Sequence, residues 1–135
     1  MSTIATQTYV RSSAEHAAER IYSAFGIERE GDAVKRLRAG PVARDAIVTL
    51  GKPERRPSLI RVAISWHVPD SGAFPHFRGF FEIRSCDGLA CIALLGYYQP
   101  PFGVAGRAFD AIAGHRIANA TIAQLLAEVA DAVSH

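Results

Sequence analysis

The chain has 135 residues, of which 49% are hydrophobic, a length and composition typical of one globular domain with a substantial core. Its 15 basic and 13 acidic residues give a net charge of +2 and are dispersed along the chain, which argues against a nucleic-acid-binding protein. No apolar run approaches the roughly 20 residues needed to cross a bilayer, and the N-terminus lacks the pattern of a secretion signal. We therefore expect a single domain, 1–135, located in the cytoplasm, with no membrane span.

The first forty residues indicate a strand followed by a helix. The stretch 4–11 alternates in hydrophobicity and contains threonine and tyrosine, as strands do. Ser12 precedes Glu15 at the spacing of a capping box, and apolar residues then recur at helical intervals until Gly26. We expect a helix between Ser12 and Gly26. The charged stretch 27–40 fits either a short helix or an irregular strand, and both alternatives stay open.

The middle of the chain, 43–99, indicates an antiparallel meander. Strand-like segments are separated by turn signals at 51–53, 69–72 and 87–88. Five strands are clear along the whole chain, and a sixth is an alternative. We expect an antiparallel sheet of five to six strands.

Two of these turns predict the register of the sheet. A two-residue turn at 87–88 pairs Gly79 with Gly96, and a four-residue loop at 69–72 pairs Ile64 with Phe77. Both turns place the same apolar residues on one face, which we expect to be the inner face: Val48, Leu50, Ile60, Val62, Ile64, Trp66, Phe77, Phe81, Ile83, Ile92, Leu94 and Tyr98.

The two cysteines are predicted to be free thiols. The turn at 87–88 places Cys86 and Cys91 diagonally on neighbouring strands, roughly 7 Å or more apart. That separation is too large for a relaxed disulfide. The five histidines and two cysteines also lack zinc-like spacing, so we expect neither a metal site nor a cofactor.

The last segment has the longest helical period in the sequence and predicts a helix from about 104 to 133. One side of this helix gathers nearly all of its apolar residues, and its only large apolar partner is the inner face of the sheet. A kink at Gly114 is an alternative to a straight helix. The residues of this apolar stripe are Val104, Ala108, Ala111, His115, Ala118, Ile122, Leu125, Leu126, Val129 and Val133.

The order of elements and several short motifs resemble the Bet v 1-like, START-related superfamily (SRPBCC), in particular its polyketide cyclase/dehydrase-like branch. The motifs are the entry to the first helix at 10–15, the stretch 94–103 (LLGYYQPPFG), Gly106, Asp110, and the stretches 115–118 (HRIA), 120–121 and 125–126. The resemblance implies an α+β helix-grip fold, in which the sheet wraps on the long terminal helix. It also implies a cavity between sheet and helix that holds a hydrophobic ligand, and some members catalyse cyclisation or dehydration there.

The predicted site is this space between the sheet and the terminal helix. Gly79 and Gly96 face each other on the inner face, which indicates either room for a ligand or a bend or close approach of the backbones. The ligand-binding residues that we expect are Val62, Ile64, Trp66, Phe77, Gly79, Phe81, Leu94, Gly96, Tyr98, Ala108, Ala111, His115 and Ile122.

His115 is the candidate catalytic residue, because it is the one polar side chain near the centre of the apolar stripe. Its imidazole could carry a proton or orient the polar end of a ligand. The alternatives are a core histidine bonded to a backbone carbonyl or to Tyr98, and a histidine that a kink at Gly114 exposes to solvent.

Three functions follow from these patterns. The first is binding of a hydrophobic or aromatic small molecule, lipid-like or polyketide-like, in the sheet–helix cavity. The second is a small cyclase, dehydratase or isomerase with His115 as general base and Tyr98 or Trp66 orienting a carbonyl. The third is a ligand-free interaction module, in which outward-facing Ile47, Phe80 and Leu95 form a homodimer contact.

Overall fold

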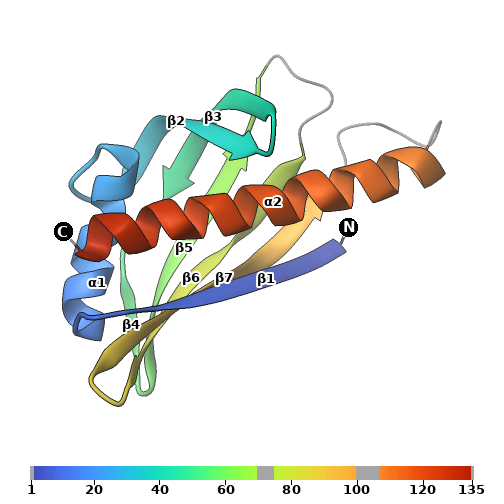
Figure 1. Cartoon of the computed structure of the whole chain (residues 1–135). Coiled ribbons are helices and arrows are strands. Elements are labelled where there is room, and N and C mark those ends of the chain that lie inside the picture. The colour runs from blue at the N-terminus through green and yellow to red at the C-terminus, as the bar shows by residue number, and fades with distance from the viewer. Residues whose placement is uncertain (1, 70–74, 100–106, 135) are drawn as a thin grey trace.

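One face of an antiparallel sheet is covered by a single long helix, and no described helix lies on the opposite face (Figure 1). The structure is a computed structural model, and it describes residues 2–69, 75–99 and 107–134, with the side chains of residue 2 and of 107–113 outside the description. The long helix, α2 (Arg107–Ser134), crosses the whole sheet and contacts the strands at both of its edges. The chain is therefore an α+β protein, as the sequence predicts.

The sheet has seven strands, so the prediction of five to six strands is wrong. Its spatial order is β1-β7-β6-β5-β3-β2, with β4 paired to β5 outside this path. The additional strands come from the charged stretch that the sequence left open, which forms β2, and from three residues before the β4–β5 turn, which form β4. The strands are β1 (Ser2–Val10), β2 (Gly31–Ala39), β3 (Val42–Leu50), β4 (Glu54–Arg56), β5 (Leu59–His67), β6 (His76–Cys86) and β7 (Leu89–Gln99).

The register between β6 and β7 is confirmed, with Gly79 opposite Gly96. Asp87 and Gly88 have φ angles of 51° and 83°, the left-handed pair that a type I′ hairpin turn needs. The predicted register between β5 and β6 is wrong by two residues, because Ile64 pairs with Gly79 and not with Phe77. Pro75 lacks an amide hydrogen, β6 begins only at His76, and the connection is longer than four residues.

A shift of two residues leaves the faces of the strands unchanged, since side chains alternate with a period of two. All twelve residues expected on the inner face are buried, none more than 7% exposed. The hydrophobic alternation therefore predicted the faces of the strands correctly, although the assumed loop length gave the wrong register between β5 and β6.

The first helix begins one residue later than predicted. Ser13, not Ser12, is the N-cap of α1 (Ala14–Arg20), and its Oγ accepts a hydrogen bond of 3.1 Å from the amide of His16. The chain then tightens into a 3₁₀ helix, η1 (Ile21–Phe25), which ends at Gly26 with a φ of 73°. Tyr22 fixes this segment to the sheet, since its Oη donates a 2.7 Å hydrogen bond to the carbonyl of Gly51.

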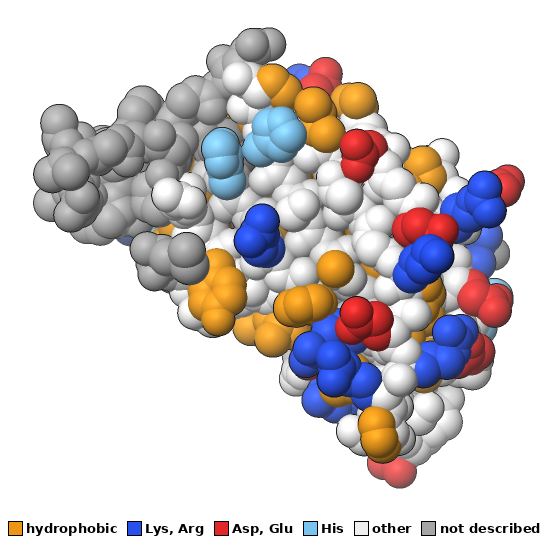
Figure 2. All heavy atoms as spheres, turned by 180° about the vertical axis from the view of Figure 1, so that it is seen from behind, with side chains coloured by type: hydrophobic (Ala, Val, Ile, Leu, Met, Phe, Trp, Pro, Cys, Tyr) orange, Lys and Arg blue, Asp and Glu red, His pale blue; other side chains and the backbone are white. Residues whose placement is uncertain are grey.

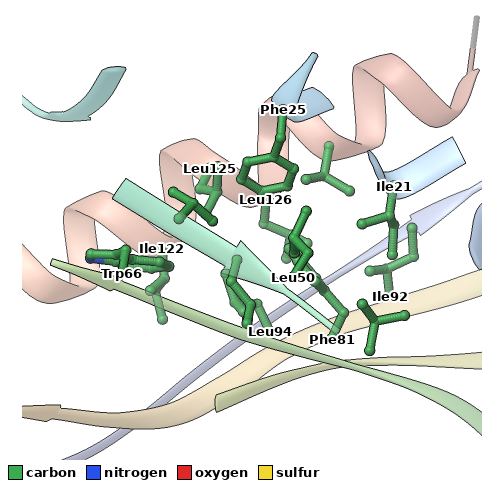
Figure 3. Close-up of a cluster of buried hydrophobic side chains, with 14 of the residues drawn as sticks. Ile21, Phe25, Leu50, Trp66, Phe81, Ile92, Leu94, Ile122, Leu125 and Leu126 are labelled. Atoms are coloured by element: carbon green, nitrogen blue, oxygen red, sulfur yellow. The ribbon is translucent and has the colours of Figure 1, made fainter. Parts of the chain in front are cut away.

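The core lies between the sheet and α2 and is closed at one end by η1 (Figure 3). Phe25 meets Phe81 edge-on, with ring centroids 6.4 Å apart. Each fully buried side chain of this size contributes roughly 1.5–3 kcal/mol. The predicted stripe on α2 is buried from Ala118 onward, at Ala118, Ile122, Leu125, Leu126, Val129 and Val133.

Several residues of the predicted features lie outside the described part of the chain. Val104, the stretch 100–103 and Gly106 lie outside the described residues, as do 70–72 of the predicted loop. Ala108, Asp110 and Ala111 belong to the helical backbone of α2, but their side chains are outside the description. Within the described residues, no helix has both the length and the hydropathy that a membrane crossing requires.

Candidate functional site

Three aromatic side chains form a row on the inner face, at the end of the sheet farthest from η1. Register places Trp66 on β5 opposite Phe77 on β6, and Phe77 opposite Tyr98 on β7. Trp66 and Phe77 are stacked, with ring centroids 4.4 Å apart and an interplanar angle of 17°. Each of the three residues is at most 4% exposed. The alternation of apolar residues on three neighbouring strands thus builds one continuous aromatic surface.

Helix α2 faces this aromatic row with small side chains. Ala118 and Thr121 are both buried, and Thr121 is the one buried polar residue in the described part of the chain. Its Oγ1 donates a 2.6 Å hydrogen bond to the carbonyl of Ile117, one turn earlier, so its hydrogen-bonding needs are met within the helix. The part of the α2 wall formed by Ala118 and Thr121 is therefore effectively apolar.

A small hollow lies between these two walls. It is lined by the three aromatic residues together with Pro75, Ala118 and Thr121, and the space between them, including its part open to solvent, is about 170 Å³. The space is too narrow to admit a water-sized sphere. It is therefore a narrow gap at the sheet–helix interface, bounded on one side by the aromatic row and on the other by Ala118 and Thr121.

His115 and Tyr98 meet at the edge of this region. Tyr98 Oη and His115 Nδ1 are 2.9 Å apart, and their ring centroids are 5.7 Å apart. Tyr98 is buried, whereas His115 is exposed. A neutral histidine has one donor and one acceptor nitrogen, so two arrangements of the proton fit this contact.

The prediction that His115 lies near the centre of the apolar stripe is wrong. Gly114, one turn before Ala118, is the buried position, and His115 lies on the flank of α2. The backbone of α2 is helical on both sides of Gly114. The buried face continues through Gly114, Ala118, Thr121 and Leu125, a line that turns His115 outward.

The other predicted lining residues are part of the packed core. Val62, Ile64, Phe81, Leu94 and Ile122 are at most 2% exposed. Figure 3 shows Phe81, Leu94 and Ile122 among the side chains of η1 and α2 that fill this space. Their part in ligand binding stays a prediction.

The glycine pair is a close approach of two backbones, which was one of the alternatives open from the sequence. A Cβ on Gly79 would lie 2.1 Å from the carbonyl oxygen of Leu95 and 2.7 Å from Cα of Gly96. A Cβ on Gly96 would lie 2.3 Å from the carbonyl oxygen of Arg78. These distances leave no room for a side chain, so the pair allows β6 and β7 to come together and does not itself provide space.

Sequence reasoning missed Pro75 and Thr121 as lining residues. Thr121 lies three residues after Ala118 and four before Leu125, so the helical period was a sufficient signal for it. Pro75 follows a loop, where no periodicity applies. Among the described side chains, no group of three or more histidine, cysteine, aspartate or glutamate residues is placed to hold a metal ion.

A known structure has a similar fold. The crystal structure of TTHA0849 from Thermus thermophilus is similar to this chain with a TM-score of 0.57 and 12% sequence identity. The similarity covers 98% of this chain and 97% of that chain. At this identity the likeness shows the fold alone. No family model matches the sequence, and no curated protein matches it.

Proposed function

We propose that the protein binds a hydrophobic or aromatic small molecule between the aromatic row and α2. The observation that carries the proposal is the hollow between Trp66, Phe77, Tyr98, Ala118 and Thr121. An aromatic surface facing small side chains suits a flat apolar molecule, since aromatic rings stack on one another at about 4.5–7 Å between centroids.

We further propose that the fold is a helix-grip fold of the Bet v 1-like, START-related superfamily. The support is the order of elements, a strand and a helical segment followed by six strands and one long terminal helix, and the packing of that helix on the sheet. Members of this superfamily hold ligands between sheet and terminal helix, which is the place of the hollow in this chain.

The hollow is smaller than a ligand of this class, so binding requires α2 or the aromatic side chains to move. The narrow gap beside Ala118 is the least costly place to make room for a ligand. Opening it breaks fewer van der Waals contacts than opening the filled core around Phe81 and Leu94. The packed part of the interface, around Phe81 and Leu94, then stays in place while the part beside Ala118 opens.

Filling the hollow tests this proposal. Ala118→Leu adds three carbon atoms at its wall, and Ala123→Leu adds the same atoms at an exposed position of α2 as the matched control. We expect native mass spectrometry of freshly purified wild-type protein to show a bound apolar molecule. We also expect saturable fluorescence enhancement of N-phenyl-1-naphthylamine, an uncharged aromatic probe, which Ala118→Leu abolishes and Ala123→Leu retains. The proposal fails if wild-type protein carries no ligand and gives no saturable signal, or if the two variants behave alike.

A second candidate function, favoured by the 2.9 Å contact between Tyr98 and His115, is proton transfer on a bound carbonyl compound. The role requires the tautomer in which Nδ1 of His115 donates to Tyr98 Oη. Nε2 of His115 is then free to accept a proton from the carbon next to the carbonyl, and the hydroxyl hydrogen of Tyr98 is free to bond the carbonyl oxygen. Return of the proton from Nε2 to another atom of the substrate completes an isomerisation.

Hydrogen–deuterium exchange at the methyl group of acetophenone in D₂O, followed by NMR, tests this candidate. General-base catalysis typically contributes about 10²–10⁴-fold, so His115→Gln should slow the protein-dependent exchange by about 100-fold or more. His16→Gln, at an exposed histidine far from the site, is the matched control. An exchange rate in His115→Gln equal to that of the wild type removes the candidate.

A further inference from the structure

The outer face of the sheet carries two neighbouring hollows that the sheet–helix site does not use. The first, which we call the basic hollow, has a volume of about 430 Å³ over the ends of β5, β6 and β7. Its lining residues on the outer face are Ser65, His67, His76, Arg78, Tyr97 and Gln99, and it is also lined by Trp66, Phe77 and Tyr98, which alternate with them and belong to the inner face. The second, the apolar hollow, has a volume of about 270 Å³ and is lined chiefly by Phe80, Leu95 and the backbones of Gly79 and Gly96. Arg78 and Tyr97 line both, so the two hollows are adjacent.

The basic hollow presents hydrogen-bond donors and no carboxylate among its described lining residues. Its cation is Arg78, and the rings of His67 and His76 lie edge to face beside it, with centroids 6.1 Å apart. Figure 2, which views this face, shows two histidine side chains next to each other with a basic side chain nearby. Such a set suits an anion, because a guanidinium offers a fork of parallel donors that matches a carboxylate or a phosphate.

Arg78 has no ionic partner within the described residues, unlike Arg61 and Arg84 on the same face of β5 and β6. Arg61, on β5, lies 2.7 Å from a carboxylate oxygen of Glu82, and Arg84, on β6, lies 3.8 Å from the other oxygen of the same carboxylate. Glu82 is thus engaged by both neighbours. Arg78 is exposed, and no described residue forms an ion pair or a hydrogen bond with its guanidinium. Its charge is therefore available to a ligand.

The apolar hollow has the opposite character. Its charges neutralise each other, since Arg61 is paired to Glu82 and lies over the ring of Phe80, 4.6 Å from the centroid. Phe80 and Leu95 are half-buried although they belong to the solvent side of the sheet. The glycine pair beneath them adds no polar side chain. An apolar or aromatic group would cover this surface and remove it from water.

We propose that this outer face binds an organic anion whose carboxylate or phosphate lies at Arg78, His67 and His76 and whose apolar or aromatic body covers Phe80 and Leu95. Arg78 and Phe80 are two residues apart on one strand, so their side chains start about 7 Å from each other. A head group separated from an aryl ring by a few bonds spans that distance. This site is separate from the hollow under α2, because it lies on the other face of the sheet.

The test uses ¹H–¹⁵N NMR titration of the full chain, with EDTA present so that no metal ion bridges the two histidines. The probes are 4-phenylbutyrate, its neutral analogue 4-phenylbutan-1-ol, and inorganic phosphate. We expect saturable shifts of amides around Arg78, Phe80 and Tyr97 with 4-phenylbutyrate, and at least tenfold weaker binding of the alcohol and of inorganic phosphate.

Two matched variants separate a built site from general attraction by positive charge. Arg78→Gln should weaken binding of 4-phenylbutyrate about tenfold or more, the usual effect of losing one charge-assisted pair. Arg84→Gln removes the same charge from the same strand and face outside both hollows, and it should change the affinity less than twofold. Both residues are exposed, and an unchanged amide spectrum in the unliganded variants confirms that they fold.

Equal losses in the two variants would overturn the proposal, as would equal affinity for the acid and the alcohol. Shifts confined to amides near Ala118 and Thr121 would place the ligand under α2 and overturn this second site while supporting the first. Loss of binding of N-phenyl-1-naphthylamine in Ala118→Leu has no bearing on the outer face. The two proposals can therefore fail independently.

Discussion

Gly96→Ala would place a methyl group between two strand backbones that leave no room for it. An ideal Cβ on Gly96 lies 2.3 Å from the carbonyl oxygen of Arg78, 2.5 Å from Cα of Gly79 and 2.9 Å from Cζ of Phe77. Two of these three atoms belong to the backbone of β6. Strand β7 cannot shift away from it, because β1 pairs along its other edge over nine residue pairs.

The expected cost follows from these contacts. Overpacking a core costs typically about 1–3 kcal/mol, and backbone atoms relax less readily than side chains, so the upper part of this range applies. Alanine returns about 0.5–1 kcal/mol of that loss, since glycine loses more conformational entropy on folding. We expect a net decrease in the free energy of unfolding of about 1–2.5 kcal/mol. For a domain of this length that decrease corresponds to a melting temperature lower by about 4–9 °C.

Urea denaturation followed by the fluorescence of Trp66 measures this loss, because Trp66 is the one tryptophan of the chain and is buried. Gly114→Ala is the matched control, since Gly114 lies within α2 and a Cβ there would meet no described atom within 4 Å. Alanine in a helix interior should stabilise the protein by up to about 1 kcal/mol. If Gly96→Ala unfolds at the same urea concentration as the wild type, the backbones do not approach as closely as we infer.

Three further predictions concern groups outside the site. Tyr22→Phe removes the hydrogen bond to Gly51 and should lower the free energy of unfolding by about 1 kcal/mol at pH 7, as measured in urea. Burial, and then the charge of Glu30, raise the pKa of Tyr22 to about 12, above the value near 10 of the unfolded chain. The unfolded chain therefore loses this proton first, and wild-type protein should lose stability between about pH 10 and 12 more steeply than Tyr22→Phe does; parallel pH profiles would contradict this. Cys91 should react more slowly with 5,5′-dithiobis(2-nitrobenzoate) than Cys86, because burial and the neighbouring Cys86 raise the pKa of the Cys91 thiol; equal rates in the single serine variants would count against it. Glu128→Gln breaks the 2.8 Å ion pair with Lys35 that joins α2 to β2 and should cost up to about 1 kcal/mol, less in 0.5 M NaCl; a salt-independent cost would show that the pair acts through packing.

The sequence predicted the faces of the sheet better than its pairings. A turn such as Asp87-Gly88 fixes the register of its hairpin because the φ angles of two residues decide it. The connection between β5 and β6 carries no comparable local signal, and its length was misjudged. The inner face was nevertheless correct, since an even shift preserves alternation and burial of Ile64 and Phe77 depends on alternation alone.

Strand β2 was left open for a related reason. Its nine residues include four charged side chains, and only Leu37 and Ala39 are buried. A strand near the edge of a sheet, with part of its inner face covered by charged side chains, lacks the strong alternation that identifies central strands. Lys35 illustrates the point, because it lies on the inner side of β2 and is accommodated through its ion pair with Glu128 of α2.

The sequence predicts which aromatic residues form the candidate site, but it does not predict how much space the site contains. Alternation and helical period brought Trp66, Phe77 and Tyr98 to one row and turned Ala118 toward it. Whether such a row encloses space depends on how completely side chains from η1 and α2 fill the interface, and a hydrophobic pattern is the same for a packed core and for a cavity. The displacement of His115 has a similar origin, since one residue along a helix is a rotation of about 100°, enough to move a side chain from the centre of a stripe to its flank.

The hollows on the outer face of the sheet could not be predicted from the sequence. Polar residues that alternate with buried residues along a strand are ordinarily solvated, so their pattern alone does not indicate a site. His76 and Arg78 lie two residues apart, and His67 lies nine residues before His76, so no sequence motif connects the three. The pairing of β5 with β6 brings them to one end of the sheet. Arg61 and Arg84 on the same two strands are paired with Glu82, whereas Arg78 has no partner among the described residues. Strand register and side-chain packing together place the unpaired charge of Arg78 beside the apolar surface of Phe80 and Leu95. The structure therefore indicates a second ligand site that the pattern of residues alone does not indicate.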